Sequence, residues 1–287
     1  MRLNTLKMII FKNATDINRF IREKRNDGKS VGFVPTMGAL HVGHISLVDM
    51  SKLTDGLTTS SIFVNPTQFN DKKDFDKYPS TIEKDIDMLE KAGCDALFLP
   101  DVAEMYPSGT NSKSPYELGY LENILEGKFR PGHFQGVCQV VDRLLDIMEP
   151  DRLYLGQKDY QQCMVLKKMT GSCHPKTEII ISPTLRELDG LAMSSRNMRL
   201  NEKQRQLAIK ISETLSFIKK EIRKGYLEDI KERATQYLTA EGFKVDYVEI
   251  ADAETLEPVE NNDGSKPLVA LIAAFVGEVR LIDNMLL

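Results

Sequence analysis

The fold of this chain is decided by residues 31–44, which read VGFVPTMGALHVGH. Residues 31–36 are a short apolar run that predicts a buried strand, and a helical stretch follows from about residue 43 to residue 52. Between them lies a turn that contains glycine and histidine. Open α/β sheets bind their ligands at turns of this kind, where a strand ends and a helix begins. The stretch therefore predicts a strand–turn–helix unit with a ligand site at the turn.

Strands and helices alternate over the first 180 residues or so. Further strands are predicted at residues 57–64, 96–99, 152–155 and 177–181, and helices at 80–92, 134–148 and 158–169. This alternation is typical of a doubly wound parallel sheet with helices on both faces. After Pro183 two helices (202–224, 227–239) precede three strands (245–250, 268–276, 279–282), which predicts a smaller α+β domain. We place the domains at 1–183 and 184–287.

Composition and charge exclude several classes of protein. The 287 residues carry 38 Lys and Arg against 42 Asp and Glu, a net charge of −4, so no basic surplus favours nucleic-acid binding. The longest apolar run is residues 268–276, about half a membrane span, and we expect no targeting segment and no membrane partner. The four cysteines form no CxxC pair, which favours free thiols in a reducing cytoplasm.

The turn at residues 37–44 has the residue types that bind phosphate. Gly38 permits a tight turn, and Gly43 permits close approach of a ligand to the backbone where the helix begins. His41 and His44 are placed so that both rings can lie at one helix N-terminus, which carries partial positive charge and suits an anion. Metal binding by the two histidines and simple helix capping are the alternatives.

Four other segments at predicted strand ends or loops are polar. Residues 189–197 combine two serines with Arg196, a fork of donors for phosphate oxygens. Residues 156–162 place Lys158 and Gln162 after a strand, residues 61–69 contain Asn65 and Gln68, and residues 130–137 begin with Arg130. Each segment alone fits ordinary turn chemistry. Neither a complete Walker A loop nor a GxGxxG after a strand is present in the sequence.

Five of these segments together resemble one family. PTMGALHVGH (35–44), IFVNPTQF (62–69), RPGHFQGV (130–137), GQKDYQQ (156–162) and DGLAMSSRN (189–197) match the motifs of the pantoate–β-alanine ligases in their order. The resemblance implies a Rossmann-like domain, a C-terminal lid domain and a homodimer. It implies that ATP and pantoate form pantoyl adenylate and pyrophosphate, and that β-alanine then displaces AMP to give pantothenate, with Mg²⁺ as the accompanying ion.

The resemblance also implies the roles of particular residues. ATP would be bound by Met37, Gly38, Ala39, Leu40, His41, Val42, Gly43, His44, Gly156, Gln157, Lys158, Asp159, Leu185, Met193, Ser194, Ser195 and Arg196. Catalytic roles would fall to His41, His44, Lys158, Ser194 and Arg196, with His44 in the family's proton-donor position. Pantoate and β-alanine would be bound by Gln68, Gln162, Asn65 and Arg130, and Asp85 would be a Mg²⁺ ligand. Gln157 departs from the family's usual Glu.

Two alternatives remain open from the sequence. The first is a nucleotidyltransferase with the same HxGH motif that acts on a cofactor precursor and forms no amide. The neutral Gln68 and Gln162 argue against it, because a phosphate-bearing acceptor calls for additional Arg or Lys. The second is a nucleotide-binding sensor, which would not need the two histidines, Lys158 and the Ser-Ser-Arg loop together.

Overall fold

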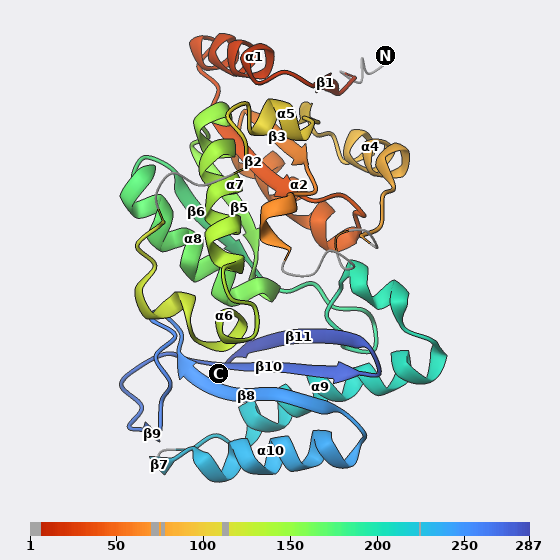
Figure 1. Cartoon of the computed structure of the whole chain (residues 1–287), viewed down its shortest axis with the longest axis vertical. Helices are drawn as coiled ribbons and strands as arrows, with labels where there is room; N and C mark the ends of the chain where they lie inside the picture. Colours follow the sequence, from red (N-terminus) through yellow and green to blue (C-terminus); the bar gives the residue numbers. More distant parts are fainter. Residues whose placement is uncertain (1–6, 70–74, 76–77, 111–114, 224) are drawn as a thin grey trace. The chain divides into compact units, whose positions relative to one another are not determined.

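The computed structural model describes residues 7–69, 75, 78–110, 115–223 and 225–287, which form two compact units (Figure 1). The first unit comprises Met1–Gly156 and Val165–Ser182, and the second comprises Gln157–Met164 and Pro183–Leu287. Residues 157–164 therefore group with the C-terminal part of the chain. The predicted boundary near residue 183 assigns them to the N-terminal domain, and that boundary stays a prediction.

A six-stranded parallel sheet forms the centre of the first unit, in the order β1-β4-β3-β2-β5-β6. Its strands are β1 (Ile9–Phe11), β2 (Val31–Thr36), β3 (Leu57–Ile62), β4 (Ala96–Phe98), β5 (Arg152–Gly156) and β6 (Glu178–Ser182). The predicted parallel sheet is confirmed. Strand β1 was not predicted, because it is a three-residue edge strand whose Ile9 and Ile10 are exposed.

Helices connect these strands. They are α1 (Ala14–Asn26), α2 (Val42–Thr54), α4 (Ile82–Lys91), α5 (Val102–Met105), α6 (Leu125–Phe129), α7 (His133–Met148) and α8 (Tyr160–Cys173), with 3₁₀ turns η1 (Pro66–Gln68), η2 (Gly119–Glu122) and η3 (Gln157–Asp159). Helix α1, which buries Ile17 and Ile21 fully and exposes much of the rest, was not predicted from the sequence. Helix α2 packs on β2, β3 and β5.

Strand β2 is the point at which the strand order reverses. The chain leaves β2 towards β3 and β4 on one side, and later returns to add β5 and β6 on its other side. Because such crossovers are right-handed, the two directions place their helices on opposite faces of the sheet. The carboxyl end of a strand at this position is the general ligand site of doubly wound sheets, and the turn at residues 37–44 begins there.

The second unit is a smaller α+β structure, as predicted. Its antiparallel sheet has the order β11-β10-β8, and α9 and α10 pack beside it (Figure 1). The elements are η4 (Ser195–Arg199), α9 (Glu202–Glu221), α10 (Glu228–Ala240), β8 (Lys244–Asp252), β10 (Leu268–Val276) and β11 (Val279–Leu286), with a short ladder of β7 (Gly225–Tyr226) and β9 (Asn261–Asn262). Leu215, Leu238 and Ile272, all fully buried, belong to its core.

Two predictions about the chain as a whole can be compared with the structure. All four cysteines are free, as the absence of a CxxC pair indicated. Among the described residues, no helix is long and apolar enough to cross a membrane.

Candidate active site

The turn that follows β2 has an unusual backbone. Gly38 has a φ of +82° and Ala39 a φ of +51°, so two successive residues are left-handed. Glycine adopts this conformation freely, whereas alanine is strained in it. Thr36 supports the turn, because its hydroxyl accepts the N–H of Gly38 at 3.2 Å and donates to the carbonyl of Ser61 at 2.7 Å. The tight turn predicted at Gly38 is present.

The carboxylate of Asp85 holds this turn from α4. Its two oxygens accept the N–H groups of Ala39 at 2.9 Å and Leu40 at 2.8 Å, and the Thr81 hydroxyl donates to both oxygens at 3.0 and 3.1 Å. Asp85 is fully buried. These contacts give Asp85 a structural role that differs from the predicted one, and its binding of Mg²⁺ stays a prediction.

The two histidines of the turn cap helix α2. His41 is the N-cap residue, and its Nδ1 accepts the N–H of Gly43 at 3.2 Å. The Nδ1 of His44 accepts the N–H of His41 at 3.3 Å, so the pair forms a reciprocal capping box with ring centroids 4.1 Å apart. Capping, one of the alternatives to phosphate binding, is therefore present.

These contacts also assign the tautomer of each ring. A neutral imidazole carries one proton, and a ring nitrogen that accepts an N–H has none. Since Nδ1 accepts in both His41 and His44, the proton is on Nε2 in both. Capping and anion binding are thus compatible, because they use opposite nitrogens of the ring. Two Nε2–H donors at the positive end of a helix form an arrangement suited to an anion.

Asn65 orients Gln68 at the end of β3. Asn65 is 1% exposed, and its amide donates to the Gln68 Oε1 at 3.2 Å and to the Gly136 carbonyl at 3.0 Å. Its oxygen accepts the hydroxyl of Tyr106 at 2.8 Å, and burial raises the pKa of Tyr106 to about 12, which keeps that hydroxyl a donor. The structure therefore gives Asn65 the role of holding Gln68, and its contact with substrate stays a prediction.

Gln68 contacts one residue just after β2 and one at the start of α7. Its Nε2 lies 2.8 Å from the sulfur of Met37, and its carbonyl accepts the Nδ1–H of His133 at 2.8 Å. The other nitrogen of His133 lies 3.0 Å from a guanidinium nitrogen of Arg130. Arginine can only donate, so His133 is neutral with its proton on Nδ1. His133 is thereby in contact with two predicted substrate-binding residues, Gln68 and Arg130.

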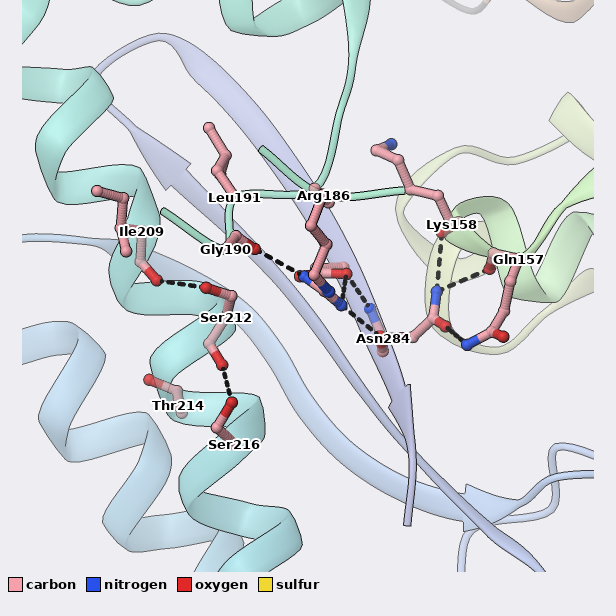
Figure 2. Close-up of polar contacts among 12 residues, drawn as sticks. Gln157, Lys158, Arg186, Gly190, Leu191, Ile209, Ser212, Thr214, Ser216 and Asn284 are labelled. Atoms are coloured by element: carbon pink, nitrogen blue, oxygen red, sulfur yellow. Dashed lines mark hydrogen bonds and ion pairs between the residues drawn. The ribbon is translucent and has the colours of Figure 1, made fainter. Parts of the chain in front are cut away.

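In the second unit, Asn284 of β11 holds the turn η3, as Figure 2 shows. Its amide nitrogen donates to the carbonyls of Gln157 and Lys158, both at 2.9 Å, and its oxygen accepts the Gln157 amide at 3.0 Å. Tyr160, at the start of α8, donates its hydroxyl to the carbonyl of Ala253 at 2.7 Å. The predicted residues at 157–159 are thus anchored to the C-terminal sheet.

Arg186 and Asp283 form a bidentate ion pair beside Asn284. The two guanidinium nitrogens meet the two carboxylate oxygens at 2.6 and 3.0 Å, and Arg186 also donates to the Gly190 carbonyl at 3.0 Å. Asp283 is 5% exposed, and burial raises its pKa although Arg186 acts in the opposite direction. The pair connects β11 to a short hairpin of residues 185–193, which leads into the predicted lid residues 193–196.

That hairpin presents the predicted lid loop. The Leu185 carbonyl accepts the Met193 N–H at 3.0 Å, and Arg186 pairs with Ala192 in an isolated bridge. Ser194 caps η4, because its hydroxyl accepts the N–H of Arg196 at 3.3 Å. The serine hydroxyl and the backbone of the loop are therefore fixed by local contacts.

The structure divides the predicted site residues into two sets. The first unit contains Met37, Gly38, Ala39, Leu40, His41, Val42, Gly43, His44, Asn65, Gln68, Asp85, Arg130 and Gly156. The second contains Gln157, Lys158, Asp159, Gln162, Leu185, Met193, Ser194, Ser195 and Arg196. In the part of the chain that the structure describes, no group of three or more His, Cys, Asp or Glu residues could hold a metal ion.

The residues that support these two sets were not predicted from the sequence. Thr81, Tyr106, Arg186, Asp283 and Asn284 stand outside the quoted motifs, and no pattern near them in the sequence marks them. Asn284, for example, is 127 residues from Gln157. One exception is the role of His133, which lies within the RPGHFQGV segment and could have been suspected there.

Comparison with known proteins agrees with these observations. The family model described as pantoate-beta-alanine ligase matches residues 9–286. The pantothenate synthetase of Cytophaga hutchinsonii is 44% identical over 283 residues, which cover 98% of this chain and 99% of the relative. That of Bacteroides thetaiotaomicron is 44% identical over 286 residues, with coverages of 97% and 98%.

Solved structures give the same result. The pantothenate synthetase of Thermus thermophilus superposes with a TM-score of 0.88 at 36% identity and covers 97% of this chain and 99% of its own. The pantoate-beta-alanine ligase of Francisella tularensis, solved in complex with beta-gamma ATP and beta-alanine, has a TM-score of 0.80 at 39% identity and coverages of 97% and 97%. The chain therefore belongs to the pantoate–β-alanine ligase family.

Proposed function

We propose that this protein condenses pantoate with β-alanine in an ATP-dependent reaction and releases AMP and pyrophosphate. In the first step a carboxylate oxygen of pantoate attacks the α-phosphorus of ATP, and the bond from that phosphorus to the β-phosphate oxygen breaks. In the second step the nitrogen of β-alanine attacks the acyl carbon of pantoyl adenylate. The acyl–oxygen bond to AMP breaks, and the nitrogen loses a proton as the amide of pantothenate forms.

The observation that carries this proposal is the histidine cap of α2. The capping contacts use the Nδ1 of His41 and of His44 and put the proton of each ring on Nε2, so a contact of either ring with a nucleotide would be made through Nε2–H. Donors aimed at phosphate oxygens stabilise the negative charge that grows on the departing pyrophosphate. His41 would contact the phosphates, and His44 would be the proton donor, as the family resemblance implies.

The other ATP residues supply positioning and further positive charge. The backbone of residues 37–40 is held by Asp85 and can approach the nucleotide closely at Gly38. Lys158 would bind the phosphates, and Ser194 and Arg196 would close over them from the lid loop, with water excluded from the adenylate. Leu185 would meet the adenine through its backbone. In-line positioning and charge stabilisation supply most of the catalysis in phosphoryl-transfer reactions.

The acceptor substrates would lie against neutral polar groups. Gln68, oriented by Asn65, would bind both pantoate and β-alanine, while Gln162 would bind pantoate. Arg130 would approach the substrate from the His133 loop. No covalent enzyme intermediate is needed. Burial raises the pKa of Cys94 and Cys138 to about 12, which keeps these thiols protonated and unreactive at neutral pH.

Mg²⁺ would accompany ATP as part of the substrate. The residues near Asp85 do not fit a resident metal, because both of its oxygens accept hydrogen bonds and the described residues contain no cluster of three ligands. Mg²⁺ commonly keeps water and phosphate oxygens as its ligands, which requires few protein groups. We propose in addition a homodimer located in the cytoplasm, as the family resemblance implies.

The test is a product assay with the purified chain. ATP, pantoate, β-alanine and Mg²⁺ should yield pantothenate, AMP and pyrophosphate. ATP and pantoate without β-alanine should yield pyrophosphate and a bound adenylate. Release of ADP and inorganic phosphate would indicate an acyl phosphate instead and would contradict the proposed mechanism. Adenylylation of a phosphate-bearing acceptor in place of pantoate would support the nucleotidyltransferase alternative.

A further inference from the structure

Every donor and acceptor of the Asn284 side-chain amide is hydrogen-bonded to the η3 turn (Figure 2). Its Nδ2 donates to two backbone carbonyls, those of Gln157 and Lys158, at 2.9 Å each. Its Oδ1 accepts the side-chain Nε2–H of Gln157 at 3.0 Å. Because an asparagine amide has two N–H donors and one oxygen, both donors are used and the oxygen is engaged. Asn284 is 2% exposed, so water does not readily replace these contacts.

The two carbonyls decide which way this amide points. A carbonyl can only accept, so the nitrogen of Asn284 must face Gln157 and Lys158, and the oxygen must face the side chain at position 157. That side chain therefore has to donate. Glutamine does, whereas a glutamate of the same length would place an acceptor against an acceptor. Rotating the Asn284 amide would only move the conflict to the two carbonyls.

The backbone of Asn284 cannot shift easily to relieve such a conflict. Its N–H donates to the Asp283 carboxylate at 2.8 Å, and its carbonyl accepts a guanidinium N–H of Arg186 at 3.2 Å. The same guanidinium is paired with Asp283 and bonded to the carbonyl of Gly190. Residue 284 is therefore held on both sides by an ionic network of the buried Asp283 and the partly buried Arg186, in which each member constrains the others.

We propose that Asn284 is a positioning residue for the η3 turn and that it is matched to an amide, not a carboxylate, at position 157. By fixing the carbonyls of residues 157 and 158, it fixes the backbone from which the Lys158 side chain departs. The effect on ATP rests on the proposed function, in which Lys158 binds the phosphates. The match between residues 157 and 284 does not rest on it.

A double-mutant cycle tests the match. The affinity for ATP is measured by calorimetry, without pantoate, for the wild type, Gln157→Glu, Asn284→Ala and the double variant. We expect Gln157→Glu to weaken ATP binding about tenfold in the wild-type background, since a buried acceptor is left facing another. In the Asn284→Ala background the opposing oxygen is gone, and the same substitution should weaken binding less than about twofold. An equal factor in both backgrounds would overturn the proposal.

The cycle is repeated on the free energy of unfolding in urea, which requires no ligand. We expect the unfolding free energies of Gln157→Glu and Asn284→Ala to be non-additive, and those of Gln157→Glu and the control Asn262→Ala to be additive. This result would support the match even if the chain has another activity. Asn262 is a suitable control because it is less buried than Asn284 and its amide donates to one carbonyl, that of Arg223, at 3.2 Å. Additive unfolding energies for positions 157 and 284 would contradict the match. Asn284→Ser replaces Asn284→Ala if the latter does not fold.

Discussion

Substitution of Asp85 by asparagine tests the role that the structure gives to this carboxylate. In the wild type, Asp85 accepts the N–H groups of Ala39 and Leu40 and the hydroxyl of Thr81. Asparagine has nearly the same size but only one acceptor oxygen. Its NH₂ group must therefore face one of the two N–H donors, which loses its partner in a fully buried position.

The structure allows the size of the effect to be worked out. A hydrogen bond to a charged acceptor contributes about 1.5–3 kcal/mol, and a buried donor without a partner costs about 1–3 kcal/mol. We therefore expect Asp85→Asn to lower the free energy of unfolding by about 2–3 kcal/mol. The strained φ of +51° at Ala39 should then relax. In the proposed function this turn approaches ATP in its held form, so the KM for ATP should rise about tenfold.

The assay combines urea denaturation with steady-state kinetics at varied ATP and Mg²⁺. Asp87→Asn is the matched control, because Asp87 is on the same helix but exposed, and it pairs with Lys91 at 2.7 Å on the surface. The control should change stability by less than about 0.5 kcal/mol. Thr81→Val removes one donor to Asp85 without disturbing its charge, and it should have a smaller effect of the same kind.

Two results would refute this reasoning. One is an Asp85→Asn enzyme with normal stability and a normal KM for ATP. The other is normal stability with an activity defect that high Mg²⁺ restores, since that pattern is typical of a lost metal ligand and would support the original prediction for Asp85.

Three further predictions concern other parts of the chain. His44→Ala should lower kcat about 10²–10³-fold, as expected for loss of a donor to the transition state, and near-normal turnover would exclude that role. Gly136→Ala would place a Cβ 2.4 Å from the carbonyl oxygen of Thr67, next to Gln68, so the KM for pantoate should rise. The control Gly171→Ala should not change this KM, because its Cβ would have nothing of the described chain within 4 Å. Although burial acts in the opposite direction, backbone N–H groups and Lys266 hold the pKa of Asp252 below its usual 3.8. Its contribution to stability is therefore complete above about pH 4 and lost as the pH falls through the lowered pKa. Urea denaturation between about pH 5 and pH 2 should show this loss for the wild type and less of it for Asp252→Asn.

Much of the fold follows from short-range signals in the sequence. Strands β2, β3 and β5 are apolar or β-branched runs ended by turn residues, and they appear within two residues of their predicted bounds. Helix α1 was not predicted, although Ile17, Phe20 and Ile21 repeat at helical spacing, because these few apolar residues lie in a short segment that is rich in charged residues. The motif residues could be identified in the same way, since each motif is contiguous.

The supporting contacts of the site could not be predicted from such signals. Asp85 is 46 residues from Ala39, and Asn284 is 127 residues from Gln157. Whether such residues meet depends on the order of the strands and on how helices pack against them. No local pattern in the sequence records either. The same holds for the assignment of Asn65 and His133 as residues that orient others.

The chain's own sequence thus predicts which residues bind a nucleotide and a hydroxy acid. It does so because glycine, histidine, lysine and amide side chains at strand ends act through local geometry. Tertiary structure decides how that chemistry is used. It orients the rings of His41 and His44 so that Nε2 carries the proton, it places the Asp85 carboxylate against the backbone N–H groups of a turn, and it requires a hydrogen-bond donor at position 157. Each of these contacts depends on a partner that only folding brings close.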